Sequence, residues 1–375
     1  MKLLKSIFSK NARHFLLMSV SFIMATVLFS CNNDDSTLNS VDRPAGTDDA
    51  SLLAWQMEKM IKTRSGSYDV ALVTTATNFN FAILNCQGEY SIDWGDGVID
   101  YNTTSHTYTD GLPAHTIFIN SYSNKSVFEI RTFDQNLIYA DISRCPDLNY
   151  FRATGSRLTN IDLSKNTGLK SLFLGGNNLS SLDLSYVSGL QYLEISENPI
   201  KNIDIKKYTG LYFLDISRTQ IKSIDLSNNK QLQTIYISGL PITTIDIKSF
   251  PFLYHFDCSG CPIDNLDFSQ NTRLTHLTCD STNITNLDLS KAQNLYFLHC
   301  SNCNITDIKF SSYLSQLGEI DIRNNPMEQN IREMTSFALS LLDRSKVTPG
   351  KLLTQTPYLS TVISLLDGYN WQINP

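Results

Sequence analysis

The stretch Leu169–Gly189, LKSLFLGGNNLSSLDLSYVSG, carries leucine at its positions 1, 4, 6, 11, 14 and 16. The same pattern of apolar residues returns every 21 residues, and self-similarity at a fixed period of this size indicates a solenoid. The last unit is displaced by one extra residue within 311–316. The ten units begin at Val127, Leu148, Leu169, Leu190, Leu211, Leu232, Leu253, Leu274, Leu295 and Leu317.

Two segments of each unit alternate between apolar and outward positions. In the quoted unit they are Leu172-Phe173-Leu174 and Leu182-Asp183-Leu184. This alternation predicts two short strands per unit, with successive coils paired in parallel about 4.8 Å apart and a rod roughly 45 Å long. Neither strand buries its apolar side alone, so stacking forms the core and atypical ends must cap it.

The unit resembles leucine-rich repeats in which segments of ten and eleven residues alternate, LxxLxLxxNx and then LxxLDLSxNxx. The resemblance covers about half of the chain, residues 127–327. It implies a mainly β fold: a right-handed leucine-rich-repeat solenoid of about ten 21-residue coils without regular convex helices. A small N-terminal β-sandwich-like domain and a C-terminal helical cap complete the expected architecture.

Residues 1–30 have the layout of a signal peptide. Four basic residues among the first 13 precede an apolar run, Phe15–Phe29, that is short for a membrane span. The run ends in Leu28-Phe29-Ser30-Cys31, which resembles a bacterial lipobox and implies lipidation of Cys31 and a lipid anchor in the membrane. Cleavage nearby by an ordinary signal peptidase is the alternative.

Residues 31–64 read as a polar tether followed by a short helix. Asp34 and Asp35 follow the lipobox cysteine, and this pattern is similar to the export signals of some Gram-negative surface lipoproteins. It favours an outer-membrane lipoprotein exposed on the cell surface over one that faces the periplasm. Thr47 is the candidate cap of a helix over 48–64, which serves either as a spacer or as a docking element.

Residues 65–126 form a different domain that we expect to cap the first repeat. Strands are predicted over Phe79–Ile83 and Tyr90–Trp94, and Asp96-Gly97 predicts a tight hairpin turn. The run Ile92–Gly97 and the strand-like segments after it resemble the polycystic-kidney-disease-type (PKD) β-sandwich. Asp93 and Asp96 are candidates for a structural turn or, alternatively, for calcium ligands.

Residues 328–375 are expected to cap the other end. Asn325, Pro326 and Glu328 predict a helix start, and apolar residues then follow one helical face as far as Leu341. A second helix is predicted over 357–367, and the alternation in 369–373 suggests a last strand.

The cysteines form a CxxC…CxxC pattern, Cys258–Cys261 and Cys300–Cys303, which commonly indicates zinc. On the repeat grid, however, the first cysteine of each pair falls at inward position 6. The second falls at position 9, where Asn177 and other units carry asparagine. We therefore expect structural roles and no metal, with zinc or a disulfide as alternatives. Cys86 and Cys145 are expected to be unpaired.

A row of histidines and a row of aspartates each have a structural and a functional interpretation. His255, His276 and His299 occupy outward positions of three consecutive coils, which suits a binding surface or, alternatively, a metal site. Aspartate stands at position 15 of eight successive units. This row matches the LDLS consensus of the resemblance and is expected to be structural, with a cation-binding ridge as the alternative.

Positions 3 and 5 of the first strand are the most informative for function, because they point outward yet carry aromatic residues. Contiguous exposed aromatic residues usually mark a binding face, although aromatic ladders also stabilise strands by stacking. Tyr212, Tyr254 and Tyr296 flank the rows. The predicted ligand-binding residues are Tyr150, Phe173, Tyr192, Glu194, Phe213, Asp215, Tyr236, His255, Asp257, His276, Phe297 and His299.

The chain contains no GxSxG, P-loop or HExxH motif, so neither an enzyme nor a cofactor is expected. A net charge of −6, with 18% charged residues, gives no reason to expect a nucleic-acid partner. The sequence predicts a monomeric recognition or adhesion protein with a protein ligand. Glycan binding and a structural stalk without a ligand are the alternatives.

Overall fold

The computed structural model describes residues 59, 61, 68–86, 88–122, 127–311, 316–330, 332, 341, 350–357, 359–366 and 371–374. The expected signal peptide, Cys31 and the tether lie outside the described residues, as do nearly all of the helix expected over 48–64 and most of the first C-terminal helix. In the described part of the chain, no helix is both long and apolar enough to cross a membrane.

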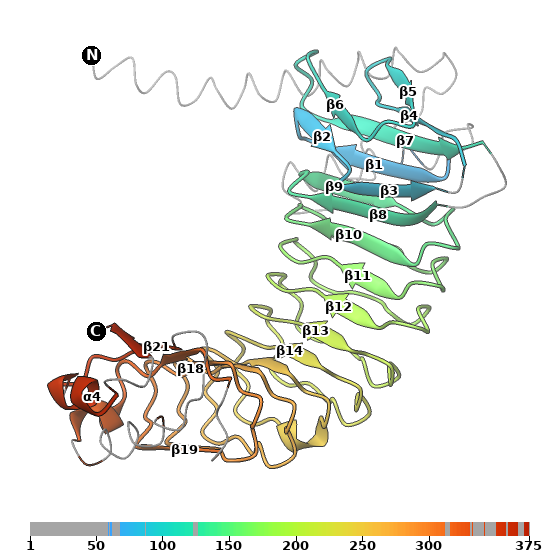
Figure 1. Ribbon diagram of the computed structural model, residues 1–375. Coiled ribbons are helices and arrows are strands. Elements are labelled where there is room, and N and C mark those ends of the chain that lie inside the picture. The colour runs from blue at the N-terminus through green and yellow to red at the C-terminus, as the bar shows by residue number, and fades with distance from the viewer. Residues whose placement is uncertain are drawn as a thin grey trace, which may run out of the picture.

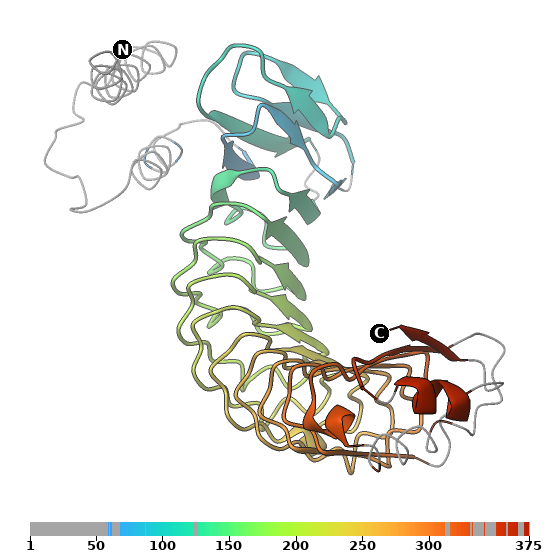
Figure 2. The ribbon, with the colours of Figure 1, turned by 90° about the vertical axis from the view of Figure 1, so that its left-hand side faces the viewer.

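The molecule is a curved rod with a β-domain at its N-terminal end and a small cap at its C-terminal end (Figure 1). One sheet of 13 strands runs along the rod, in the order β22-β21-β20-β18-β16-β15-β14-β13-β12-β11-β10-β8-β3. Its strands line the inner side of the curve (Figure 2), and this side is called the concave face below. The predicted leucine-rich-repeat solenoid is confirmed.

Successive strands of the concave face pair in parallel at equivalent positions of the repeat. Tyr192 pairs with Phe213 one unit later, whereas Phe297 pairs with Glu319 because of the extra residue in between. The central strands are β10 (Tyr150–Thr154), β11 (Ser171–Phe173), β12 (Tyr192–Glu194), β13 (Phe213–Asp215), β14 (Thr234–Tyr236), β15 (His255–Asp257), β16 (His276–Thr278), β18 (Phe297–His299) and β20 (Glu319–Asp321).

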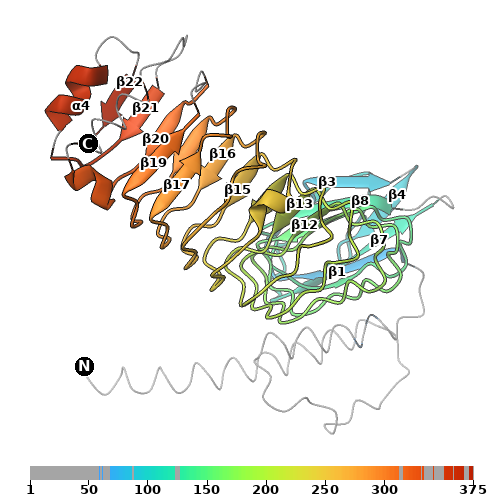
Figure 3. The ribbon, with the colours of Figure 1, turned by 90° about the horizontal axis from the view of Figure 1, so that it is seen from below.

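The second strand expected in every unit is found in three described units. In the first unit it is β9 (Leu137–Asp141), which pairs with a strand of the N-terminal domain. The other two are β17 (Asn286–Leu289) and β19 (Asp307–Phe310), which pair with each other on the outer side of the curve (Figure 3). In most units the aspartate at position 15 caps a turn that follows this segment. Oδ1 of Asp183, for example, accepts a hydrogen bond of 2.8 Å from the backbone N–H of Ser185. Asp288 makes the same bond within β17, so the bond caps the turn without by itself preventing a strand. The expectation of two strands per unit was wrong for most coils.

The core is the continuous stack of inward residues. Leu169, Leu172 and Leu174 are fully buried, as are their equivalents in the neighbouring coils. Burial of each such side chain contributes about 1.5–3 kcal/mol. The residue at position 14 is less covered: Leu182 is only partly buried.

Buried asparagines connect the coils to one another. At position 9, Nδ2 of Asn198 donates to the backbone O of Leu174 in the preceding coil at 2.8 Å, and its Oδ1 accepts from the N–H of Leu179 at 2.9 Å. A second set at position 19, which was not predicted, repeats the device. Asn229 there donates to the carbonyls of Ile205 and Tyr208.

The N-terminal domain contains an antiparallel sheet in the order β5-β4-β7-β1-β9 and a small β2-β6 ribbon. The predicted hairpin at Asp96-Gly97 joins β4 to β5. The strands are β1 (Val70–Thr74), β2 (Asn78–Asn80), β4 (Tyr90–Asp93), β5 (Ile99–Tyr101), β6 (Ser105–Thr107), β7 (His115–Ser121) and β9 (Leu137–Asp141).

The strand predicted over Phe79–Ile83 is split between two sheets, so that prediction was wrong. The N–H of Phe81 bonds to Thr104, whereas the N–H of the next residue, Ala82, bonds to Arg131. The chain changes partners at this point. It then continues as β3 (Ile83–Cys86), which pairs with β8 (Val127–Phe133) and ends the concave sheet.

The expected boundary between residues 126 and 127 is bridged in both directions. Strand β9 belongs to the first repeat unit but pairs with β1, while β3 comes from the N-terminal domain and pairs with β8. The domain therefore caps the first coil through shared sheets.

The C-terminal cap contains η3 (Pro326–Gln329), β21 (Gly350–Leu353), α4 (Leu359–Leu366) and β22 (Trp371–Asn374). The predicted second helix and last strand correspond to α4 and β22. The predicted helix start at Asn325 and Pro326 is found as the 3-10 turn η3. Strand β21 was not predicted, and it extends the concave sheet by pairing with β20.

Candidate functional site

All twelve predicted ligand-binding residues lie at outward positions of the concave face. Parallel register places Tyr192 beside Phe213 and Glu194 beside Asp215 on the neighbouring strand. Eleven of the twelve side chains are half-buried, and Tyr192 is 40% exposed. Their neighbours in the rows cover part of each ring, so these residues form a surface layer rather than separate protrusions.

The rings of this layer contact one another from β10 to β14. The ring centroids of Tyr150 and Phe173 are 5.2 Å apart, and those of Phe173 and Phe213 are 6.2 Å apart. Phe213 also contacts Tyr192 at 6.5 Å and Tyr236 at 5.7 Å. Phe213 is therefore the centre of a group of four rings drawn from four coils.

The same chain of contacts continues from β14 to β18. Tyr236 contacts His255 at 4.9 Å, and His255 contacts His276 at 4.7 Å. His276 then meets Phe297 at 5.8 Å, and Phe297 meets His299 at 4.0 Å. We call the whole set the aromatic row. Its members are Tyr150, Phe173, Tyr192, Phe213, Tyr236, His255, His276, Phe297 and His299.

Three tyrosines at position 2 of alternate coils border the aromatic row. Tyr254 and Tyr296 are 42% and 50% exposed, and Tyr212 contacts Tyr192 at 6.3 Å. They leave a margin of exposed rings along one side of the row. Such a margin widens the apolar surface that a ligand could cover.

Carboxylates lie among the rings at position 5. Oε1 of Glu194 accepts a hydrogen bond from Ser196 Oγ at 2.7 Å, and its Oε2 is buried without a hydrogen bond. Burial raises the pKa of Glu194, and Asp215 raises it further. Burial also raises the pKa of Asp215, and Asp257 adds repulsion. A Cβ on Gly175 would overlap Oε1 of Glu194, so a larger residue there would displace this carboxylate.

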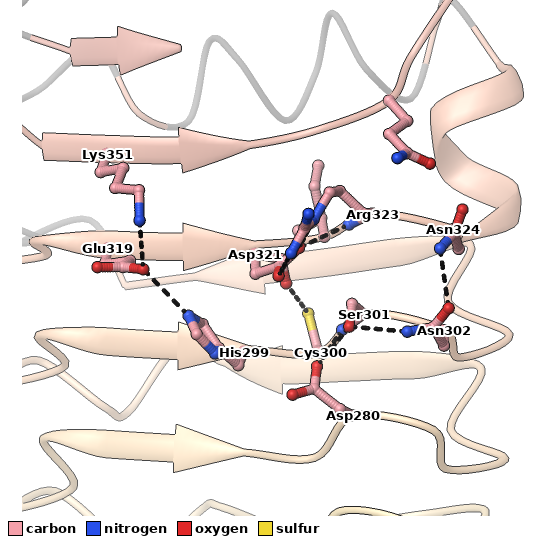
Figure 4. A network of polar contacts seen from close by, with 12 residues as sticks. Asp280, His299, Cys300, Ser301, Asn302, Glu319, Asp321, Arg323, Asn324 and Lys351 are labelled. Atoms are coloured by element: carbon pink, nitrogen blue, oxygen red, sulfur yellow. Dashed lines mark hydrogen bonds and ion pairs between the residues drawn. The ribbon is translucent and has the colours of Figure 1, made fainter. Parts of the chain in front are cut away.

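The C-terminal end of the concave face is a network of neutralised charges (Figure 4). Oε1 of Glu319 lies 3.0 Å from Lys351 Nζ and 3.3 Å from His299 Nε2. Although burial opposes it, the bonds from Lys351 and His299 lower the pKa of Glu319. Asp321 is paired with Arg323 at 2.6 Å.

The three histidines do not assemble a metal site. Burial, and then the neighbouring His276, lower the pKa of His255 to about 4, and burial lowers the pKa of His276 as well. Nowhere in the described ranges do three or more His, Cys, Asp or Glu residues form a group that could hold a metal ion. His255 and His276 serve the face as aromatic rings, whereas His299 also contacts Glu319.

The cysteines have the two positions that the repeat grid predicted. Cys258, Cys279 and Cys300 are fully buried in consecutive coils, and burial raises the pKa of each thiol well above its usual value. At position 9, Sγ of Cys261 donates to the backbone O of Ile237 at 3.0 Å, as the asparagines at this position do. All seven described cysteines are free, including Cys86 and Cys145.

The aspartate row forms turn caps. Oδ1 accepts the backbone N–H two residues later in most of these units, for example in Asp225 and Asp267. Lysines of neighbouring coils pair with the second oxygen in some units, as Lys206 does with Asp225 at 2.8 Å. In the N-terminal hairpin, Asp93 and Asp96 likewise accept turn N–H groups, and Asp96 contacts His106 at 2.7 Å.

Sequence reasoning missed the charged residues at the two ends of the concave face. Arg131 and Arg152 lie over aromatic rings at the N-terminal end, and Glu319 and Asp321 belong to the C-terminal network. All four occupy positions 3 or 5 of the repeat grid. Applying the grid to the first, second and last units would have found them.

Two solved structures of bacterial proteins have the same fold. The functional domain of InlJ from Listeria monocytogenes, which includes a cysteine ladder, is 30% identical, with a TM-score of 0.53 over 61% of this chain and 50% of that one. The leucine-rich-repeat protein LIC12759 from Leptospira interrogans is 15% identical, with a TM-score of 0.52 over 62% of each chain.

The chain spans half the length of the InlJ domain that it matches. Neither a protein-family model nor a curated protein matches it. The comparisons confirm the leucine-rich-repeat fold.

Proposed function

We propose that this protein is a non-catalytic recognition or adhesion protein that binds a protein ligand through the aromatic row of its concave face. The observation that carries the proposal is the unbroken chain of ring contacts from Tyr150 to His299 at outward positions. Core packing does not require these rings, because the inward positions are filled. Leucine-rich-repeat solenoids offer extended concave surfaces, which supports this use.

The location belongs to the same proposal. The lipobox-like run ending in Cys31 supports a lipid anchor in the outer membrane, and the acidic residues after it support exposure on the cell surface. The N-terminal domain, PKD-like in its Ile92–Gly97 run, would then lie between the anchor and the repeats. The protein acts as a monomer in this proposal.

A triple variant, Tyr192→Ala, Phe213→Ala and Tyr236→Ala, tests the binding face. Cells that carry the full-length chain are applied to protein and glycan arrays, and the chain's melting temperature is measured in parallel. Truncation of anchor residues typically costs about 2 kcal/mol of binding each, so binding to the protein array should be lost. The matched control removes exposed rings away from the face, Tyr101→Ala, Tyr122→Ala and Tyr186→Ala, and should bind normally.

The outcomes distinguish a protein ligand, a glycan ligand and a structural stalk without a ligand. Loss of binding to glycans instead of proteins would favour the glycan alternative, for which the exposed Tyr254 and Tyr296 offer stacking surfaces. A melting temperature lowered by tens of degrees would identify the rings as a stacking ladder of a stalk. Unchanged binding and stability would place the binding face elsewhere.

A further inference from the structure

The N-terminal coils hold their own arginine side chains against the aromatic row. The guanidinium carbon of Arg131 lies 4.0 Å from the ring centroid of Tyr150, and its Nε donates to Oε1 of Glu129 at 2.6 Å. Ring faces attract cations, and carboxylates accept guanidinium N–H groups in a matching geometry. These coils therefore contain a complete arrangement of ring, carboxylate and guanidinium.

The coils from β12 to β15 contain the rings and the carboxylates of this arrangement, but no described lysine or arginine is paired with those carboxylates. Glu194, Asp215 and Asp257 stand at position 5 there. Glu194 and Asp215 lie on the strands that carry Tyr192 and Phe213, and Tyr236 lies between Asp215 and Asp257. Within the described ranges, no lysine or arginine forms an ion pair with any of these three carboxylates, although the charge of Arg152 acts on Glu194 from a neighbouring coil.

The C-terminal coils differ from the middle of the face, because their carboxylates are paired with cations. Asp321 stands at the same position 5 and Glu319 at the outward position 3 of the same strand, and each has a cation of its own, Arg323 and Lys351 respectively. The chain thus neutralises the carboxylates at this end of the concave face, as it does Glu129 at the other end. In the described part of the chain, the three carboxylates in the middle form no ion pair of this kind.

The chemistry of these three carboxylates favours a cationic ligand. They are already half-buried, and any ligand that covers them removes more water from them. A neutral ligand would increase that desolvation cost without neutralising the charge, whereas a guanidinium group would offset it. A guanidinium group also stacks on aromatic rings more readily than an ammonium group does.

We propose that the middle of the concave face binds an arginine side chain of the partner protein, seated over Tyr192 and Phe213 with its guanidinium group against Glu194 and Asp215. The inference rests on the proposed function and names the chemistry of the partner. It makes the affinity dependent on salt, because attraction between charged groups at a surface is screened.

The test uses the full-length chain and a fluorescent oligoarginine peptide as the probe, followed by fluorescence anisotropy. The matched neutral probe replaces every arginine by citrulline, which keeps the shape and removes the charge. The test variant is Glu194→Gln with Asp215→Asn. The control variant, Asp162→Asn with Asp183→Asn, makes the same change in net charge at turn caps away from the concave face.

We expect the test variant to bind oligoarginine about tenfold or more weakly, the control variant to bind as the wild type does, and the citrulline peptide to bind no variant. Equal weakening in both variants would show attraction by net charge alone and would overturn the inference. Binding of the citrulline peptide equal to that of oligoarginine would overturn it too.

The two proposals fail in different ways. If the aromatic triple variant loses binding on the protein array while Glu194→Gln with Asp215→Asn retains it, the aromatic face stands and the arginine inference is wrong. If only glycans are bound, and binding is insensitive to salt, both the protein ligand and its arginine are excluded.

Discussion

The hydroxyl group of Tyr236 lies 3.0 Å from Nδ1 of His255, its neighbour in the next coil. This contact joins the two halves of the aromatic row. His255 is neutral at neutral pH, since burial and the adjacent His276 hold its pKa at about 4 against an ordinary value of 6.5.

Stability should therefore decrease in acid through His255. Its pKa is lower in the folded state than in the unfolded state, so its contribution is complete above pH 6.5 and is lost as the pH falls towards about 4. Melting temperatures of the wild type and of His255→Gln should converge as the pH falls through this window. A constant difference between the two proteins would contradict the shift.

The two kinds of cysteine should respond differently to substitution. Cys261→Asn should change the free energy of unfolding by about 1 kcal/mol or less, because an asparagine amide can donate to the carbonyl of Ile237 as the thiol does. Cys279→Ser should cost more, since it puts a hydroxyl group at a fully buried core position. Urea unfolding measures both. Stoichiometric zinc in the purified protein would overturn the structural roles.

Asn198 should be among the most sensitive polar residues. Asn198→Ala removes a side chain that serves the carbonyl of Leu174 and the N–H of Leu179, and it leaves both groups buried without this partner. The expected loss is about 2–4 kcal/mol. Asn228→Ala, at an exposed position, is the control and should stay within about 0.5 kcal/mol. Similar losses in the two variants would refute the role of the buried asparagines in connecting the coils.

Glu328 should hold the C-terminal cap to the last coil. Its buried carboxylate accepts a hydrogen bond from the hydroxyl of Thr354, and one of 2.6 Å from the N–H of Gln355. Glu328→Ala should increase amide hydrogen exchange in β21 and β22 while β12 and β13 stay protected. Uniform exchange along the whole rod would show that the cap and the repeats unfold together.

The anchor prediction concerns Cys31. Replacing Cys31 with Ala should release the protein from membranes into soluble fractions, which cell fractionation measures. If the variant is processed normally and stays membrane-bound, the lipid anchor is wrong.

The sequence by itself determined the solenoid, because a 21-residue period of leucine-like residues can be buried only by stacking coils. The same grid placed the aromatic row, the buried cysteines and the position-9 asparagines correctly, since side-chain direction follows from position in the repeat. Strand alternation also located the Asp96-Gly97 hairpin.

Tertiary structure alone decided how the first repeat is joined to the N-terminal domain. The split of Phe79–Ile83 and the exchange of β3 and β9 between sheets depend on partners far away in sequence, and local alternation carries no information about partners. Tertiary structure likewise decided which carboxylates of the concave face are paired with a cation. Glu319 obtains Lys351 from a strand 32 residues later, whereas Glu194 and Asp215 form no ion pair with any described lysine or arginine. Only the pairing of strands fixes which charged side chains become neighbours.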